Sequence, residues 1–271
     1  MRGQVRIYQE KIVARRRKEL LYRMLIVAGI LIVVISSLSL LSRADSFKVA
    51  SVEVSGTGVL AEGTVASMVH DRISGNYLGI FSRSNSLIYP KDAVASVVAS
   101  LPPVKSVEVK RKDLRSLAID VVEREKEFIW CTAEEGLEAC YMLDYDGFVF
   151  AKAQNVSSSD FVYRGALPVE PLGKYALPID EFRKIRFFLE ELEGLSVGTR
   201  EAAISETGYM TIYLDRGGKI VVDTKDDLSV ILGNIAAVIT DKAVAPSLPE
   251  FLDRLDYIKL DSGNKVVYKM K

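Results

Sequence analysis

The feature that most constrains this chain is an uncharged run of 19 residues near the N-terminus, residues 24–42, MLIVAGILIVVISSLSLLS. As an α-helix, such a run rises about 28 Å, close to the roughly 30 Å hydrocarbon core of a bilayer. The run therefore predicts a membrane-spanning helix. The alternative is a cleaved signal peptide, with Ser42 and Ala44 as small residues at the cleavage site, although the apolar core of a signal peptide is usually shorter.

Basic residues flank this helix on one side only. Residues 1–23 carry eight Lys and Arg side chains against two Glu, and four of the basic residues form the run 15–18. Lys and Arg are enriched in the cytoplasmic segments beside membrane helices. We therefore expect a cytoplasmic segment at 1–23 and an extracytoplasmic chain after residue 42, and the basic run indicates topology rather than a nucleic-acid partner. No later apolar run reaches spanning length, so the sequence predicts a single-pass protein of the cell (inner) membrane.

The segment 47–125 has the patterns of a small α+β domain. It includes the stretch LPPVKSVEVKRKDLRSLAIDVVERE, in which two alternating apolar and charged runs predict an antiparallel hairpin with one dry and one charged face. Two helices on one face of a three-stranded sheet would bury the dry face, in the order β-α-α-β-β. The expected elements are a strand at 47–55, helices at 62–73 and 90–100 joined by a linker at 76–89, and strands at 104–110 and 117–124.

The segment 126–271 predicts a larger mixed α/β domain with a mainly antiparallel sheet. We expect Asp180 to cap its first helix, and Thr224 with Asp227 to form a capping box before its second. The last strand has exposed charge at both ends, which favours a place at the edge of the sheet. The expected elements are strands at 128–132, 140–143 and 148–150, a helix at 180–193, strands at 202–205, 209–214 and 219–222, a helix at 228–239, and strands at 256–260 and 265–268.

Few residues suggest chemistry. Cys131 and Cys140 stand nine residues apart on either side of an acidic loop between two expected strands. In an exported domain this spacing can place them across a hairpin, so we expect a disulfide bond, with two free thiols as the alternative. His70 is the single histidine and is expected on the solvated side of its helix. The sequence predicts no catalytic residue, no cofactor and no metal site.

The order of these motifs resembles the FtsQ/DivIB family of bacterial cell-division proteins over nearly the whole chain. The resemblance includes the basic stub, the single membrane helix and Trp130 on a short strand. The chain departs from the family at Lys259 and Leu260, where the family more usually has an Asp-Leu-Arg pattern. The segments that carry it are VEVSGTGVL, LPPVKSVEVKRKDLRSLAIDVVERE, YMLDYDGFVF, KIVVDTKDDLSVILGNI and YIKLDSGNKVVYK.

The resemblance implies a POTRA domain at 47–125 and a β domain at 126–271 in a protein that is not an enzyme. Members hold two small single-pass partners, FtsL and FtsB, at the division septum and help to regulate septal peptidoglycan synthesis. Other membrane proteins of the divisome would bind the POTRA domain. The β domain takes its partner as an added strand beside its own last strand. Carried onto this chain, the contact falls on Leu260, Asp261, Ser262, Gly263, Val266 and Tyr268.

Two other functions fit parts of the pattern. A POTRA-bearing component of a secretion or sporulation channel would form rings or precede a β-barrel, and no barrel sequence follows here. An anchored cell-wall hydrolase or peptidase would need a nucleophile and a base that converge, which the sequence does not offer.

Overall fold

The computed structural model describes residues 2–132, 139–157, 160–261 and 265–271, with side chains from residue 17 onward except those of 261 and 265. These residues form two compact units. The N-terminal unit takes in the chain up to residue 100 together with 106–122, and the C-terminal unit takes in 101–105 together with 123–271. It is a mixed α/β protein with one long N-terminal helix and a large mixed sheet.

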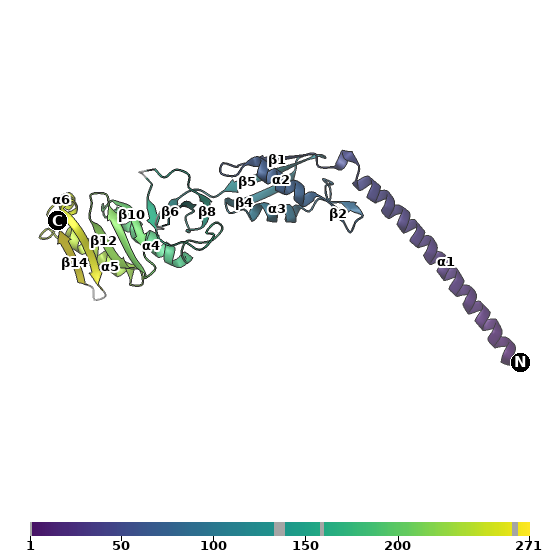
Figure 1. Cartoon of the computed structure of the whole chain (residues 1–271). Helices are drawn as coiled ribbons and strands as arrows, with labels where there is room; N and C mark the ends of the chain where they lie inside the picture. The colour runs from purple at the N-terminus through teal and green to yellow at the C-terminus, as the bar shows by residue number, and fades with distance from the viewer. Residues whose placement is uncertain (1, 133–138, 158–159, 262–264) are drawn as a thin grey trace. The chain divides into compact units, whose positions relative to one another are not determined.

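The N-terminal helix α1 runs from Arg2 to Ser42 (Figure 1). Its part Arg17–Ser42 contains an 18-residue stretch with a mean hydropathy of 2.8 and is long and apolar enough to cross a membrane. The large apolar side chains of this part are exposed within the chain. A helix of this kind near the N-terminus is consistent with a single membrane anchor or a signal sequence.

The rest of the N-terminal unit contains a three-stranded sheet in the order β1-β5-β4 with two helices. β1 is parallel to β5, whereas the four-residue connection between β4 and β5 requires an antiparallel pair. The three strands of this sheet and the two helices follow each other in the expected β-α-α-β-β order, with a small hairpin between the two helices. The elements are the 3₁₀ turn η1 Asp45–Phe47, β1 Ser51–Ser55, α2 Glu62–Ile73, β2 Asn76–Tyr77, β3 Phe81–Ser82, α3 Lys91–Ala99, β4 Val104–Arg111 and β5 Ser116–Glu123.

Three details differ from the sequence prediction. The first strand begins at Ser51, because residues 45–47 form the turn η1. The segment 76–89, expected as a plain linker, contains the small β2–β3 hairpin. The β4–β5 hairpin was expected to bury the whole of its dry face. Val107 on β4 is only half-buried, whereas Val109 on β4 and Leu117, Ile119 and Val121 on β5 are buried.

The C-terminal unit is built on a nine-stranded sheet in the order β14-β13-β12-β11-β10-β9-β6-β7-β8. Its strands are β6 Phe128–Cys131, β7 Cys140–Leu143, β8 Val149–Lys152, β9 Val162–Arg164, β10 Thr199–Ile204, β11 Tyr209–Leu214, β12 Lys219–Asp223, β13 Leu255–Asp261 and β14 Lys265–Met270. Its helices are α4 Ile179–Gly194, α5 Leu228–Thr240 and α6 Leu248–Arg254.

The sheet is mixed. β9 is parallel to both β6 and β10, and β12 is parallel to β13, while the other neighbouring pairs are antiparallel. The sequence prediction missed β9 and α6. β9 has only three residues, too few to establish an alternating pattern, and α6 spans only two turns.

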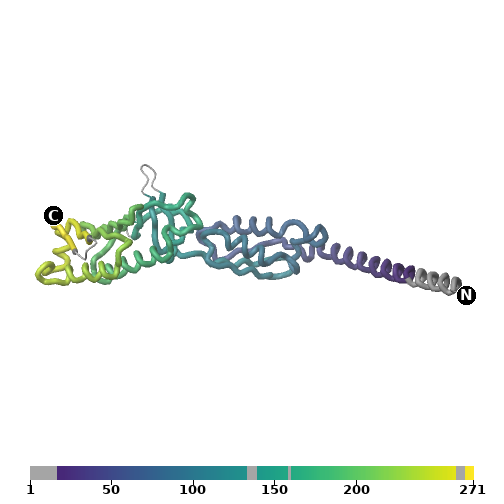
Figure 2. Tube along the Cα trace, turned by 90° about the horizontal axis from the view of Figure 1, so that it is seen from below, coloured from purple at the N-terminus to yellow at the C-terminus, as the bar shows by residue number. Residues whose placement is uncertain are grey.

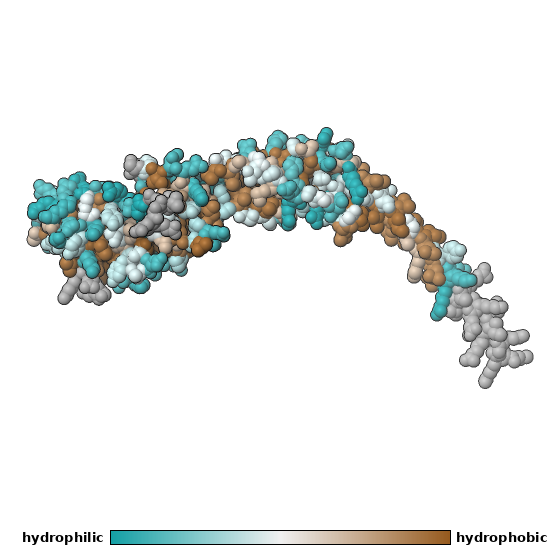
Figure 3. Space-filling view, viewed as in Figure 1, coloured by the Kyte–Doolittle hydropathy of each residue, from teal (hydrophilic) through white to brown (hydrophobic). Residues whose placement is uncertain are grey.

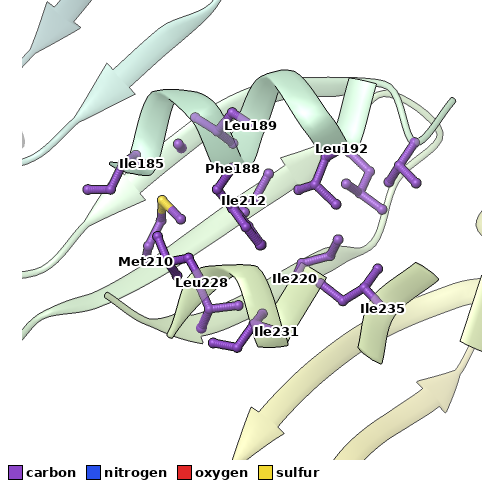
Figure 4. Close-up of a cluster of buried hydrophobic side chains, with 14 of the residues drawn as sticks. Ile185, Phe188, Leu189, Leu192, Met210, Ile212, Ile220, Leu228, Ile231 and Ile235 are labelled. Atoms are coloured by element: carbon purple, nitrogen blue, oxygen red, sulfur yellow. The ribbon is translucent and has the colours of Figure 1, made fainter. Parts of the chain in front are cut away.

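Helices α4 and α5 cover one face of this sheet (Figure 4). Their apolar stripes meet the inward side chains of β11 and β12 in one buried cluster. Each such side chain stabilises the fold by about 1.5–3 kcal/mol through removal from water. The labelled members are Ile185, Phe188, Leu189 and Leu192 of α4, Met210, Ile212 and Ile220 of the sheet, and Leu228, Ile231 and Ile235 of α5.

The two expected helix caps are both corrected. α4 begins one residue earlier than expected, after Pro178, so Asp180 lies in the first turn, where a carboxylate still favours the helix dipole. α5 is capped by Asp227 itself, whose carboxylate accepts hydrogen bonds from the next helical N–H groups. Thr224 is not part of a capping box, because its hydroxyl donates to the carbonyl of Gly208 at 2.9 Å.

Arg124 fixes the entry into the C-terminal unit. Its backbone N–H donates to the carbonyl of Pro103 at 2.8 Å, and its Nε donates to that of Pro102 at 3.2 Å. The guanidinium pairs with Asp144 and lies 4.1 Å from the ring centroid of Phe148. The Asp144 carboxylate also accepts backbone hydrogen bonds within its own turn, as expected for an Asp-Gly turn.

Cys131 and Cys140 lie directly opposite each other on β6 and β7 and form a disulfide bond. We expect replacement of both residues by serine to lower the free energy of unfolding by about 2–3 kcal/mol, because the bond restricts the unfolded chain. Urea unfolding followed by the fluorescence of the single tryptophan measures the effect. A reductant should lower the midpoint of the wild type and leave that of the double variant unchanged. Equal midpoints in all samples would contradict this prediction.

Candidate partner-binding site

The last strand of the chain, β14, lies at one edge of the nine-stranded sheet. It is labelled in Figure 1, and in Figure 2 it belongs to the yellow end of the tube. Within the described residues it pairs with β13 alone, in an antiparallel register that sets Ile258 opposite Tyr268 and Leu260 opposite Val266. The expectation of an edge position for this strand is therefore confirmed. Its other side presents backbone groups that no neighbouring strand takes up.

The inner strand β13 holds this edge in place. It pairs with β12 on its other side through residues 257–259. Ile258 and Leu260 are buried in the main core, at 1% and 6% exposed. The terminal hairpin is therefore a fixed part of the sheet, and the edge that it offers is preorganised.

Along β14 the backbone N–H and C=O groups of successive residues point alternately toward β13 and toward the open side of the sheet. At the end of the strand, the N–H of Lys271 donates to the carbonyl of Arg254 at 2.8 Å, so Lys271 faces β13. In an antiparallel pair, residues with inward and outward backbone groups alternate along each strand. The one irregularity of this pair is an extra residue on β13, so the alternation along β14 is not interrupted. Val266, Tyr268 and Met270 therefore direct their N–H and C=O groups outward.

The side chains of these three residues lie on the helix-covered face. Val266 and Met270 are half-buried against the main core. Tyr268 is 41% exposed, and its ring centroid lies 5.9 Å from that of Phe251 on α6. A strand added at this edge would therefore contact a tyrosine ring that packs against Phe251 on one part and is exposed on the rest.

The opposite face of this end of the sheet carries no buried aliphatic side chain. Val267 is 49% exposed, and Lys269 forms an ion pair with Asp256 at 3.1 Å. One cross-strand row on this face alternates aromatic and basic side chains along neighbouring strands. Its members are Tyr213, Lys219, Tyr257 and Lys269. The face suits contact with an aromatic or acidic partner side chain at the rim of the edge.

The six residues expected at the contact have different places. Val266 and Tyr268 are on the edge strand with outward backbone groups. Leu260 is buried on the inner strand, so it supports the hairpin and does not line the edge. Asp261 ends β13, and Ser262 and Gly263 lie outside the described residues. The resemblance did not indicate Met270, whose outward position follows only from the register.

In the described part of the chain no group of three or more His, Cys, Asp or Glu side chains could hold a metal ion. His70 is exposed on α2, as expected, and belongs to the N-terminal unit, whereas the candidate edge belongs to the C-terminal unit. The chemistry that this end of the sheet offers is therefore backbone hydrogen bonding together with aromatic and charged side chains.

No family model matches the chain, and no curated protein is similar enough to stand as a relative. The functional argument consequently rests on the geometry of the β14 edge.

Proposed function

We propose that the chain is a membrane-anchored, non-catalytic scaffold of the bacterial division complex, of the FtsQ/DivIB type. In this proposal residues 47–125 are a POTRA domain and 126–271 a β domain. FtsB-like and FtsL-like partners bind by adding a strand beside β14, and the assembly at the septum helps to regulate septal peptidoglycan synthesis. The observation that carries the proposal is the unpaired outer side of β14.

An unpaired strand edge is a binding site in physical terms. Backbone N–H and C=O groups recruit an extended peptide, and the side chains that alternate along it supply selectivity. Natural proteins usually protect such an edge with charges, proline or a covering segment. β14 contains no proline, and its two lysines, Lys265 and Lys269, are residues whose backbone groups face β13. The residues with outward backbone groups, Val266, Tyr268 and Met270, are uncharged. The edge is therefore suited to accept a strand.

The remaining features support an extracytoplasmic scaffold. The apolar part of α1, with its basic N-terminal flank, would anchor the chain with its N-terminus in the cytoplasm. The Cys131–Cys140 disulfide suits an oxidising compartment outside the cytoplasm.

The charged face of the β4–β5 hairpin would serve other divisome membrane proteins. Its charges already form ion pairs, with Lys110 2.7 Å from Glu108 and Lys112 2.6 Å from Glu53. The hydrogen bond that the Lys112 ammonium donates to the Glu53 carboxylate raises the pKa of Lys112. Exposed pairs of this kind contribute little to stability. Together they leave a surface on which positive and negative charges nearly balance, and such a surface would orient a partner rather than bind it tightly.

The test is isolation of the full-length chain from its own membranes in mild detergent, followed by identification of what comes with it. We expect small single-pass membrane proteins whose extracytoplasmic parts contain an extended segment. Ring-shaped assemblies of the chain alone would favour a channel component instead. Turnover of peptidoglycan by the purified chain would favour a hydrolase. Either result, without single-pass companions, would contradict the proposal.

A further inference from the structure

The C-terminal end of α1 is fastened to the β2–β3 hairpin of its own unit. The Ser39 hydroxyl donates to the carbonyl of Ile80 at 2.7 Å. The Arg43 guanidinium donates to the carbonyls of Gly79 and Ile80 at 3.2 and 3.3 Å. The helix end and the hairpin loop are thus held side by side.

A second set of hydrogen bonds strengthens this junction from within. The Ser42 carbonyl accepts from the side-chain amide of Asn85 at 3.0 Å, and the Ser42 hydroxyl accepts from the N–H of Ser82 at 3.2 Å. Ser42 and Asn85 are among the few buried polar residues of the described chain. Because these buried groups are satisfied only in this arrangement, the position of the loop relative to α1 is fixed.

The loop held in this way presents apolar side chains to the outside. Leu78 is 96% exposed, the highest value among the large apolar side chains of the described residues. Its φ angle of 49° lies in the left-handed region, which is unfavourable for a residue other than glycine. Ile80 beside it is also exposed, as are Leu87 and Ile88 after the hairpin. No packing within the unit accounts for a leucine held in this conformation.

The position of this junction, close to the C-terminal end of the apolar run of α1, suggests what covers these exposed side chains. Ser39 lies inside the apolar run, about 4.5 Å before its end at Ser42. The headgroup regions add roughly 5–7 Å to each side of the hydrocarbon core. In Figure 3 the brown surface of the helix continues onto the adjoining end of this unit. A loop bonded to Ser39 therefore lies at the level of the outer bilayer surface when α1 spans the membrane.

We propose that the loop Tyr77–Phe81 of the β2–β3 hairpin dips into the outer surface of the lipid bilayer, with Leu78 and Ile80 inserted among the lipids. The occupant of the exposed apolar surface is the membrane itself, because the surface is continuous with the membrane helix. Tyr77 suits the interface, where its ring can contact lipid while its hydroxyl donates to the carbonyl of Ile88 at 3.0 Å. The inference rests on the membrane anchoring proposed above. It gives the unit a second point of attachment, which fixes its tilt on the bilayer.

The test uses full-length chains with one introduced cysteine, since both native cysteines are disulfide-bonded. Leu78→Cys is labelled with an environment-sensitive fluorophore and reconstituted into phosphatidylethanolamine–phosphatidylglycerol vesicles. Some vesicles contain lipids brominated near the headgroup, which quench fluorescence at that depth, and others contain lipids brominated at the ends of the acyl chains, which quench the Ile32 label at the bilayer centre. Ile32→Cys, in the middle of the apolar run, reports whether α1 is in the bilayer. Val59→Cys is the matched control, since Val59 is exposed and follows the end of β1, a strand that extends for about 16 Å from its start at Ser51.

We expect the Leu78 label to be blue-shifted and to lose most of its fluorescence to the brominated lipids, while the Val59 label is unaffected. A Leu78 label that behaves like the Val59 label, with the Ile32 label quenched, would overturn the loop insertion and leave the membrane anchor intact. A failure of the Ile32 label to be quenched would overturn the anchor and the loop insertion together.

Discussion

Replacement of Val266 by proline is expected to abolish partner capture while the chain remains folded. The Val266 N–H faces the open side of β14, so proline removes a donor that an added strand needs and none that the β13–β14 pair uses. Proline is tolerated on edge strands for this reason. An unsatisfied partner carbonyl and the bulk of the ring would weaken binding by about 2 kcal/mol or more, roughly thirty-fold.

Two further substitutions make this experiment specific. Val266→Ala keeps the outward N–H and loses only part of a half-buried side chain, so it should retain capture. Val267→Pro removes an N–H that faces β13 and should instead destabilise the terminal hairpin. Co-isolation of the single-pass companions is measured for all three variants with the wild type. Undiminished capture by the Val266→Pro variant would show that the contact lies elsewhere.

Replacement of Trp130 by alanine is expected to give the largest loss of stability of any substitution considered for this chain, about 3–5 kcal/mol. Trp130 is 1% exposed and stacks on Tyr163 with ring centroids 5.7 Å apart. Its Nε1–H donates to the carbonyl of Gly165 at 3.1 Å. Alanine would leave a large cavity and an unpaired carbonyl in the C-terminal unit. Urea unfolding followed by circular dichroism measures the loss.

Trp130→Phe is the informative companion to this variant. It keeps an aromatic ring in the core and should lose less stability than the alanine variant. A buried tryptophan cannot contact a partner, so the phenylalanine variant should capture partners as the wild type does. Loss of capture without loss of stability in Trp130→Phe would mean that this residue is part of the binding site.

Local patterns predicted the regular elements well. The residues of α2 and β11 agree with the expected ranges, because their apolar positions follow a clear helical or alternating period between turn residues. The short elements β9 and α6 were missed, since three residues cannot display an alternating period and seven residues cover barely two helical turns. The cap of α5 was displaced, because several Asp and Thr residues near its start could fill the position and the tertiary structure selects Asp227. The cap of α4 was displaced, because the helix begins directly after Pro178 and Asp180 falls inside its first turn.

The candidate edge was only partly predictable. Charge at both ends of the last strand indicated an edge, and the resemblance singled out Val266 and Tyr268. The direction of each backbone N–H depends on the register with β13 and on the extra residue within that pair, which a sequence pattern does not display. The loop at Leu78 was read as a linker, since a two-residue strand pair leaves almost no local signal.

The most direct test of the account is amide hydrogen exchange along β14, resolved by residue, in the chain alone and in the complex isolated from its membranes. In the chain alone, the amides of Val267 and Lys269 should exchange slowly, and those of Val266, Tyr268 and Met270 quickly. In the complex, all five should exchange slowly, because an added strand accepts from the outward three. Outward amides that exchange as fast in the complex as in the free chain would contradict strand addition at this edge.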